Sequence, residues 1–321
     1  MLLFLLVMVL AKAQKIVLIE QGKQTSIRGL SVVNNKIAWI SGSNGYTALT
    51  TDGGKTWIWQ QVKGFEKADF RDIEAFSANE AIIMAAGTPA LILKTTDGGK
   101  NWHVRYRNTD TAYFLDAMKF TTPNYGLALG DPIKNKFVLL ETKDGGETWD
   151  KFQNRPNALS GEAAFAASGT CLRFEGNTIK IVTGGTVSRE LNYHHNNWLY
   201  KNTILKQGKP SEGAFSISSN GFVIVGGDYQ NDHNADSVVE YYSFNEGILP
   251  KTPPAGYQSC VEQISKNTYL STGTPGSNIS TDGGKNWAKI DDVSFNVCRK
   301  AKHGTLVILA GNNGRIAVLK L

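Results

Sequence analysis

Four charged residues recur at nearly constant intervals in the first half of the chain. They are Arg28, Asp72, Asp116 and Glu162, and they lie 44, 44 and 46 residues apart. Carboxylates beside an arginine could bind a polar or anionic ligand, and two carboxyl groups at a suitable separation could hydrolyse a glycosidic bond. If the interval reflects a structural repeat, these side chains lie on one face of a ring of repeats.

Three later loops add polar residues that we expect on the same face. They are Gly130-Asp131-Pro132, the stretch from Gly184 to Arg189, and Gly226-Gly227-Asp228-Tyr229. Glycine lets a backbone approach a ligand closely, and the planar guanidinium of Arg189 could hold a carboxylate or a phosphate. The predicted binding residues are Arg28, Arg71, Asp72, Asp116, Asp131, Glu162, Arg189, Asp228 and Tyr229. No motif among them assigns a catalytic residue, so the catalytic group is unknown.

A second interpretation of the same residues stays open. Charges at the neck of a ring lose hydration and need either a ligand or an internal partner. Arg28 and Arg71 could therefore neutralise the neighbouring acids on a solvated rim. The glycine-aspartate pairs could equally be simple turns.

The elements that would position these residues are indicated by an eight-residue phrase, Thr/Ser-x-Asp-Gly-Gly-x-Thr/Asn-Trp, which occurs four times. Its aspartates and tryptophans are Asp52 and Trp57, Asp97 and Trp102, Asp144 and Trp149, and Asp282 and Trp287. Asp-Gly provides the positive φ angles of a tight turn, and the carboxylate accepts backbone N–H groups there. The tryptophan offers a large apolar face to a neighbour. We therefore predict that these eight residues are structural.

The spacing of the phrase predicts the number of repeats. Its aspartates are 45, 47 and 138 residues apart, and 138 is three times 46, so two degenerate copies are expected near residues 190 and 236. A unit of this length holds about four strands, the size of one propeller blade. Inner strands are predicted to begin near Ser26, Phe70, Phe114, Ala163, Ala214, Ser259 and Phe295. The predicted fold is an all-β, seven-bladed β-propeller of four-stranded antiparallel blades.

The N-terminal residues carry two further predictions. Residues 15–20 are expected to complete the seventh blade, which otherwise has three strands and an exposed edge. Residues 2–10 are continuously apolar and precede Ala11-Lys12-Ala13, as in a secretory signal, and the run is too short to span a bilayer. We predict a signal peptide at 1–13, a single propeller at 14–321, and a periplasmic or secreted protein. A buried N-terminal strand is the alternative.

Composition excludes several classes of function. The net charge is +6 without a block of Lys and Arg, so nucleic-acid binding is not expected. The three cysteines, Cys171, Cys260 and Cys298, cannot all pair, and buried free thiols are expected. The sequence has no dinucleotide fingerprint and no cluster with metal-ligand spacing, so we expect no cofactor and no metal. A monomer without a transmembrane anchor is expected.

The repeated phrase resembles the repeat of Asp-box propellers, also called bacterial neuraminidase repeats. Over its predicted mature length the chain is similar to the photosystem II stability/assembly factor-like family, whose bacterial members are often labelled oxidoreductases. No redox motif in this sequence supports that label. The resemblance implies a binding or assembly scaffold. It would hold a protein partner, a glycan or a small anionic ligand at the mouth of its central channel.

The same superfamily includes sialidases, so glycoside hydrolysis is the alternative. Resemblance to these enzymes implies three arginines on the substrate carboxylate, for which Arg28, Arg71 and Arg189 are candidates. It also implies a tyrosine nucleophile and acidic partners. The candidates for these roles are Tyr229, Asp72, Asp116 and Glu162. A third hypothesis is a purely structural surface module whose rim charges pair internally.

Overall fold

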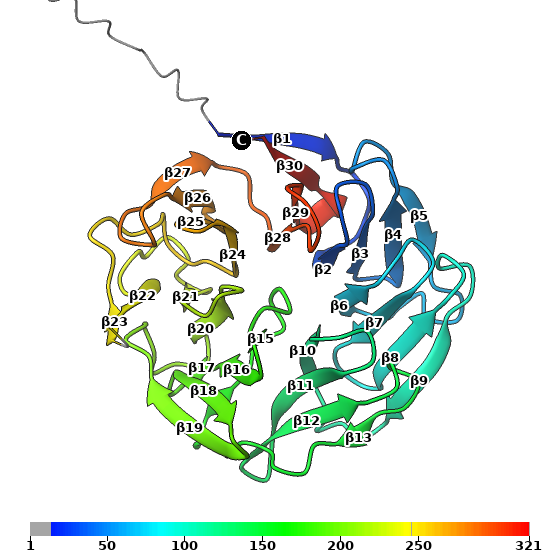
Figure 1. Cartoon of the computed structure of the whole chain (residues 1–321), viewed down its shortest axis with the longest axis horizontal. Helices are drawn as coiled ribbons and strands as arrows, with labels where there is room; N and C mark the ends of the chain where they lie inside the picture. The colour runs from blue at the N-terminus through cyan, green and yellow to red at the C-terminus, as the bar shows by residue number, and fades with distance from the viewer. Residues whose placement is uncertain (1–13, 245, 321) are drawn as a thin grey trace, which may run out of the picture.

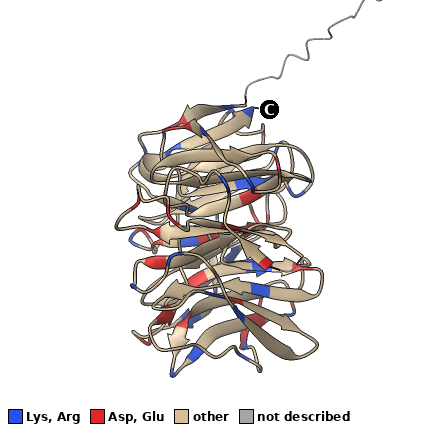
Figure 2. Cartoon of the chain, turned by 90° about the vertical axis from the view of Figure 1, so that its left-hand side faces the viewer, with Lys and Arg blue, Asp and Glu red and all other residues tan. Residues whose placement is uncertain are grey.

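The computed structural model describes residues 14–244 and 246–320, which form seven sheets arranged in a ring around a central axis (Figure 1). This confirms the predicted seven-bladed β-propeller. The predicted signal peptide, residues 1–13, lies outside the described residues. No helix in the described part of the chain has the length and apolar character needed to cross a membrane. Acidic and basic residues are dispersed along the strands and loops of the ring, as Figure 2 shows.

The first three blades follow the chain in order, each with its inner strand first. Blade one contains β2 (Ile27–Val32), β3 (Ala38–Gly42), β4 (Tyr46–Thr50) and β5 (Ile58–Gln61). Blade two contains β6 (Phe70–Ala75), β7 (Ala81–Ala85), β8 (Ala90–Thr95) and β9 (His103–Asn108). Blade three contains β10 (Leu115–Phe120), β11 (Gly126–Ile133), β12 (Lys136–Thr142) and β13 (Asp150–Lys151).

Blades four and five are less regular. Blade four contains β15 (Leu172–Glu175), β16 (Thr178–Val182), β18 (Arg189–His194) and β19 (Asn197–Asn202). Blade five contains β20 (Glu212–Ile217), β21 (Val223–Asp228), β22 (Val239–Ser243) and β23 (Glu246–Ile248). Two short strands, β14 (Glu162–Ala163) and β17 (Gly184–Gly185), extend the sheet of blade five at its inner edge.

The last two blades complete the ring. Blade six contains β24 (Cys260–Ser265), β25 (Thr268–Gly273), β26 (Gly276–Ser280) and β27 (Ala288–Asp291). Blade seven contains β28 (Val297–Lys300), β29 (Val307–Ala310), the 3-10 turn η1 (Asn312–Gly314) and β30 (Ile316–Lys320), with β1 (Lys15–Glu20) outermost. β1 pairs antiparallel with β30, Val17 opposite Val318, so the predicted closure of the ring by the N-terminal strand is confirmed.

Each Asp box is a turn held by its own side chains. In the first, the Thr50 hydroxyl donates to Asp52 Oδ1 at 2.8 Å and accepts from the amide of Gly54 at 3.0 Å. Asp52 also accepts from the amide and the hydroxyl of Thr56. The boxes around Asp97, Asp144 and Asp282 repeat these bonds. The sequence phrase is thus a self-contained turn that presents a tryptophan.

The Asp boxes join each blade to the preceding one at four of the seven junctions. Gly54 lies against Val318 and Ile308 of blade seven, and Trp57 belongs to the same apolar cluster. The other three contacts are Trp102 on Trp39, Gly146 on Ile82, and Gly284 on Val223 and Tyr241. In blades four and five, by contrast, β18 leads to β19 and β22 to β23 through short turns without an Asp box. The expected degenerate copies are replaced there by these tighter hairpins.

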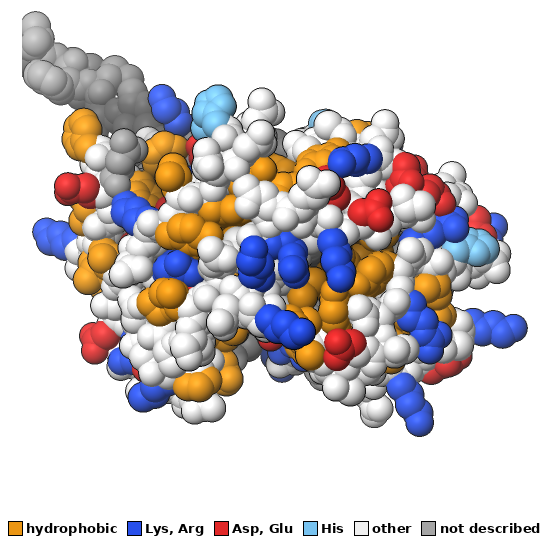
Figure 3. All heavy atoms as spheres, turned by 90° about the horizontal axis from the view of Figure 1, so that it is seen from below, with side chains coloured by type: hydrophobic (Ala, Val, Ile, Leu, Met, Phe, Trp, Pro, Cys, Tyr) orange, Lys and Arg blue, Asp and Glu red, His pale blue; other side chains and the backbone are white. Residues whose placement is uncertain are grey.

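The two junctions that flank blade four carry surface grooves. One groove, between blades three and four, includes Tyr125, Phe152 and Tyr193. The other, between blades four and five, includes Leu199 and Phe222, which are 65% and 51% exposed. Figure 3 views the edge of the ring and shows apolar side chains between basic ones.

A conservative change tests the Asp-box turn. In Thr50→Val the buried amide of Gly54 loses its acceptor and Asp52 loses a donor, so the free energy of unfolding should fall by about 1–2 kcal/mol. Chemical denaturation followed by tryptophan fluorescence measures this. Thr51→Val is the matched control, because Thr51 is exposed beside the same turn. Equal effects of the two changes would show that the hydroxyl of Thr50 does not hold the turn.

Candidate binding sites at the two ends of the channel

The central channel is blocked by residues 163–171, which we call the plug. The sequence predicts the inner strand of blade four near Ala163, but β15 begins at Leu172 and the preceding residues enter the channel. Arg28 Nη1 donates to Ala167 O at 3.3 Å, and Arg299 Nη2 donates to Ser168 O at 2.6 Å. Side chains in the plug are mostly small, which lets the segment fit where the seven inner strands converge. The plug leaves one cavity on each side.

The cavity on the face opposite the Asp boxes has a volume of about 480 Å³, and we call it the anchor cavity. Five of the nine predicted binding residues line it: Arg28, Arg71, Asp116, Asp131 and Tyr229. The pairing register of the inner strand shifts at Arg28 in β2, at Arg71 in β6 and at Asp116 in β10. Such bulges re-aim one side chain. The same irregularity in three successive blades therefore brings these residues into one cavity.

Arg28 is the basic residue of this cavity that has no acidic partner among the described residues. Its guanidinium makes the single hydrogen bond to Ala167 O, although it carries five N–H donors. Burial, followed by the neighbouring Arg71, lowers the pKa of Arg28, but a guanidinium stays charged. Arg71 differs, because its Nε pairs with Asp69 Oδ2 at 2.7 Å. The anchor cavity therefore presents a guanidinium with unused donors.

Asp116 is buried at the same cavity, and neither of its carboxyl oxygens has a hydrogen-bond partner among the described residues. Burial first, and the neighbouring Asp131 second, raise the pKa of Asp116 well above its usual value, with Arg71 acting in the opposite direction. Burial also raises the pKa of Asp131 to about 6, although its Oδ1 accepts from the amide of Ala164 in the plug. The raised pKa favours the protonated form of the Asp116 carboxyl, which can donate a hydrogen bond.

Aromatic rings form one wall of the anchor cavity. Phe165 of the plug stacks on Phe215 with centroids 3.8 Å apart and planes 8° apart. Tyr257 and Tyr229 meet Phe215 edge to face at 4.9 and 6.1 Å. Tyr229 is 47% exposed and so lies at the entrance. Of these four rings the sequence predicted only Tyr229. The plug brings Phe165 to the wall, and a register shift in β20 lies at Phe215.

Asp72 does not reach the anchor cavity. Its oxygens accept from the amides of Ile73 at 2.8 Å and Met118 at 2.7 Å, so the carboxyl bridges β6 to β10. It lines the cavity on the Asp-box face instead. The constant interval from Arg28 through Asp72 to Asp116 is misleading, because the residue equivalent to Arg28 in blade two is Arg71. The structure therefore corrects the predicted placement of Asp72.

Glu162 and Arg189 pair with each other, away from the cavity. Arg189 Nε and Nη2 donate to the two oxygens of Glu162 at 2.9 and 2.5 Å, and the Thr183 hydroxyl donates to Glu162 at 2.6 Å. Both side chains are buried. The guanidinium that was predicted to hold a ligand carboxylate thus holds a carboxylate of its own chain. Asp228 is also buried and accepts from the amide of Gln230, as expected of a turn residue.

Comparisons with known proteins agree with this architecture. The family model described as "Photosynthesis system II assembly factor YCF48" matches residues 11–109, which include blades one and two. A search of curated proteins gave no match.

Solved structures match almost the whole ring. One is "YCF48 bound to D1 peptide", with 16% identity, a TM-score of 0.67, and coverage of 98% of this chain and 97% of that one. YCF48 from Cyanidioschyzon merolae has 16% identity, a TM-score of 0.65, and coverage of 95% and 98%. Virginiamycin B lyase from Staphylococcus aureus has 10% identity, a TM-score of 0.68, and coverage of 96% and 99%. At these identities the likeness shows the fold, which serves binding proteins and enzymes alike. The chain is an Asp-box β-propeller that resembles the photosystem II assembly factor YCF48 family, most clearly in its first two blades.

Proposed function

We propose that this protein is a binding scaffold that holds a peptide segment of a partner protein in the anchor cavity. The observation that carries the proposal is the half-buried guanidinium of Arg28, which lacks an acidic partner among the described residues and lies beside a wall of aromatic rings. A related propeller that is solved with a bound D1 peptide supports a peptide as the class of ligand.

The chemistry of the cavity indicates an acidic peptide. A carboxylate can accept two N–H donors from the guanidinium of Arg28, in the geometry that arginine favours. The carboxyl of Asp116, when it is protonated, can donate a hydrogen bond to the same anion, and an apolar neighbour in the peptide can pack on Tyr229 and Phe215. A cationic peptide would be repelled by Arg28. The expected ligand therefore has an aspartate or glutamate next to an apolar residue.

Glycoside hydrolysis has less support than binding. The three arginines of a sialidase-like site are not assembled, because Arg189 is paired with the buried Glu162. Asp116 and Asp131 both lie in the anchor cavity, and both have raised pKa values. An assay with sialoside and aryl glycoside substrates tests whether this pair hydrolyses a glycosidic bond, and we expect no hydrolysis. The family model that matches residues 11–109 is that of an assembly factor.

We also propose that the protein acts outside the cytoplasm. The support is the sequence alone, namely the apolar run at residues 2–10 and the small residues that follow it. N-terminal sequencing of the protein from its native cells tests this, and a mature N-terminus near Gln14 is the expected result.

Removing the guanidinium of Arg28 should weaken peptide binding strongly. Hydrogen bonds to a charged group contribute about 1.5–3 kcal/mol, so Arg28→Gln should raise Kd about 10- to 150-fold. The probe is a fluorescent peptide pool that contains one Glu next to one Phe in an otherwise Gly/Ser sequence, measured by anisotropy. The same pool with Gln in place of Glu should bind about as weakly to the parent protein.

The control variant is Arg107→Gln, because Arg107 is exposed on the outer strand β9 of blade two. Its affinity for the Glu-containing pool should match that of the parent protein. If Arg28→Gln binds as the parent does while its thermal unfolding is unchanged, the anchor cavity is not the peptide site.

A further inference from the structure

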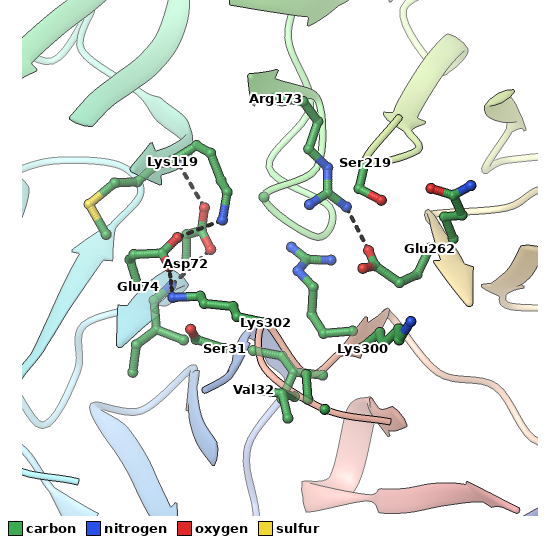
Figure 4. Close-up of a pocket in the computed structure, with 18 residues that line it drawn as sticks. Ser31, Val32, Asp72, Glu74, Lys119, Arg173, Ser219, Glu262, Lys300 and Lys302 are labelled. Carbon is green, nitrogen blue, oxygen red and sulfur yellow. Dashed lines mark hydrogen bonds and ion pairs between the residues drawn. The ribbon is translucent and has the colours of Figure 1, made fainter. Parts of the chain in front are cut away.

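The cavity on the Asp-box face of the plug is separate from the proposed peptide site. It has a volume of about 370 Å³ and is lined by the C-terminal halves of inner strands from several blades. Figure 4 shows charged side chains converging on it from opposite sides, with Lys119, Glu74 and Lys302 on one side and Arg173 and Glu262 on the other. We call it the basic cavity.

Positive charge exceeds negative charge in this cavity. Its five basic residues are Lys119, Arg173, Arg299, Lys300 and Lys302, and its three acidic residues are Asp72, Glu74 and Glu262. Two of the acids already have basic partners. Glu74 accepts from both Lys119 and Lys302, and Glu262 pairs with Arg173 at 2.8 Å. Burial raises the pKa of the third acid, Asp72, to about 7, so it cancels one charge incompletely at neutral pH.

Two basic groups have no carboxylate partner within ion-pair distance among the described residues. Lys300 Nζ donates to Ile264 O at 2.8 Å, and Arg299 Nη2 donates to Ser168 O of the plug. Arg299 Nη1 also donates to Cys298 O and to Cys260 Sγ at 3.3 Å, so the thiol of Cys260, with its pKa lowered to about 5, offsets part of one positive charge. A carbonyl oxygen orients a cation but does not neutralise it. The excess of positive charge affects the pKa of Lys119. Burial lowers this pKa, and the nearby Lys302 and Arg173 lower it further, against the effect of Glu74. A mobile anion would remove this excess of positive charge.

We propose that the basic cavity binds a multiply charged oxyanion of the phosphate class. Its donors come from blades three, four and seven, and therefore approach the centre from several directions. A tetrahedral phosphate has acceptor oxygens on all sides, whereas a planar carboxylate accepts mainly along its edge. The volume exceeds that of one phosphate ion and leaves room for a second phosphoryl group or an esterified one. Positive charge gathered in a cavity also attracts such anions.

Calorimetric titration of the purified propeller with pyrophosphate tests the proposal, at ionic strength held constant with chloride. We expect one saturable site. Lys300→Gln and Lys302→Gln should each raise the Kd for pyrophosphate at least tenfold. Lys143→Gln is the matched control, because Lys143 lies in the Asp box of blade three on the same face and its side chain is 73% exposed. Its affinity should stay within twofold of the parent.

Further ligands separate the sources of the anion. Tighter binding of pyrophosphate than of glucose 6-phosphate indicates a free polyphosphate, and the reverse order indicates an esterified phosphate. Citrate at equal concentration should bind at least tenfold more weakly than the better of the two. Equal binding of citrate, or no heat with either phosphate, would overturn the assignment.

Thermal unfolding of the variants separates a loss of binding from a loss of folding. Lys302 shares Glu74 with Lys119, so its loss affects a buried carboxylate. Lys300 bonds only to a backbone oxygen in the described structure, so Lys300→Gln should unfold at the parent temperature. A folded Lys300→Gln variant with parent affinity would exclude the basic cavity as the phosphate site.

Discussion

The free energy of unfolding is expected to fall as pH rises from about 5 to 8, and Asp116→Asn should remove much of that fall. Asp116, Asp72 and Asp131 all have pKa values raised in the folded protein, the last two to about 7 and about 6. A raised carboxyl pKa contributes stability that is complete below the unfolded pKa of about 3.9 and is lost as pH rises through the folded value. Each extra proton held by the folded state contributes a slope of about 1.4 kcal/mol per pH unit.

Glu74 does not mask this slope. Burial alone would raise its pKa, but Lys119 and Lys302 outweigh burial and hold it at about 2. A lowered carboxyl pKa contributes stability that is lost only as pH falls through the folded value, which is below the window from pH 5 to 8. Cys260 acts in the opposite direction: burial raises its pKa, but the hydrogen bond with Cys298 and the charge of Arg299 lower it to about 5, so this one thiol adds stability as pH rises. The expected slope is therefore the effect of three raised acids reduced by that of one lowered thiol.

Urea unfolding of the parent and of Asp116→Asn at pH 5, 6, 7 and 8 measures the effect. The variant should be more stable than the parent at pH 8, because an amide needs no proton to stay neutral. Asp150→Asn is the control, since Asp150 is exposed on β13 and should leave the slope unchanged. A parent protein whose stability rises between pH 5 and 8 would contradict the burial of these acids.

Truncation of one side chain in the closing strand should also have a large effect. Ile16 is 6% exposed and packs in the cluster that joins blade seven to blade one. Ile16→Ala should lower the free energy of unfolding by about 2–4 kcal/mol, as is typical of buried aliphatic truncations. It should also favour aggregation, because a loosened β1 leaves the edge of β30 unpaired.

Leu18→Ala in the same strand is the matched control for the closure. Leu18 is 42% exposed, so its truncation should change the stability by no more than about 0.5 kcal/mol. Denaturant unfolding of both variants, with light scattering to detect aggregates, measures the two effects. Equal small losses would mean that the ring is held closed by other contacts.

The fold could be predicted because its signals are local. The turn chemistry of Asp52 and its three counterparts depends on residues within one phrase, and the spacing of the phrase then gives the blade count. The closing strand followed from the three-stranded count of the last blade. Both predictions needed no knowledge of contacts between distant residues.

The site could be predicted only in part, because it depends on register and on long-range pairing. A shift of one residue decides whether Arg71 or Asp72 faces the anchor cavity, and neither composition nor spacing reveals where a bulge lies. The partnership of Arg189 with Glu162 links residues 27 positions apart. The plug was missed because its small residues carry no strand or helix periodicity.

The uneven distribution of the Asp boxes has a consequence for how the chain is completed during synthesis. Three consecutive junctions with an Asp box join blade seven to blade one, blade one to blade two, and blade two to blade three. They include the first and last described strands, whereas the grooves on either side of blade four lie near the middle of the sequence. The junction between blades seven and one forms only after β30 leaves the ribosome and meets β1. A prematurely terminated chain would therefore lack the junction that unites its ends. Such a product would display unpaired strand edges to proteases, so the architecture distinguishes finished from unfinished molecules.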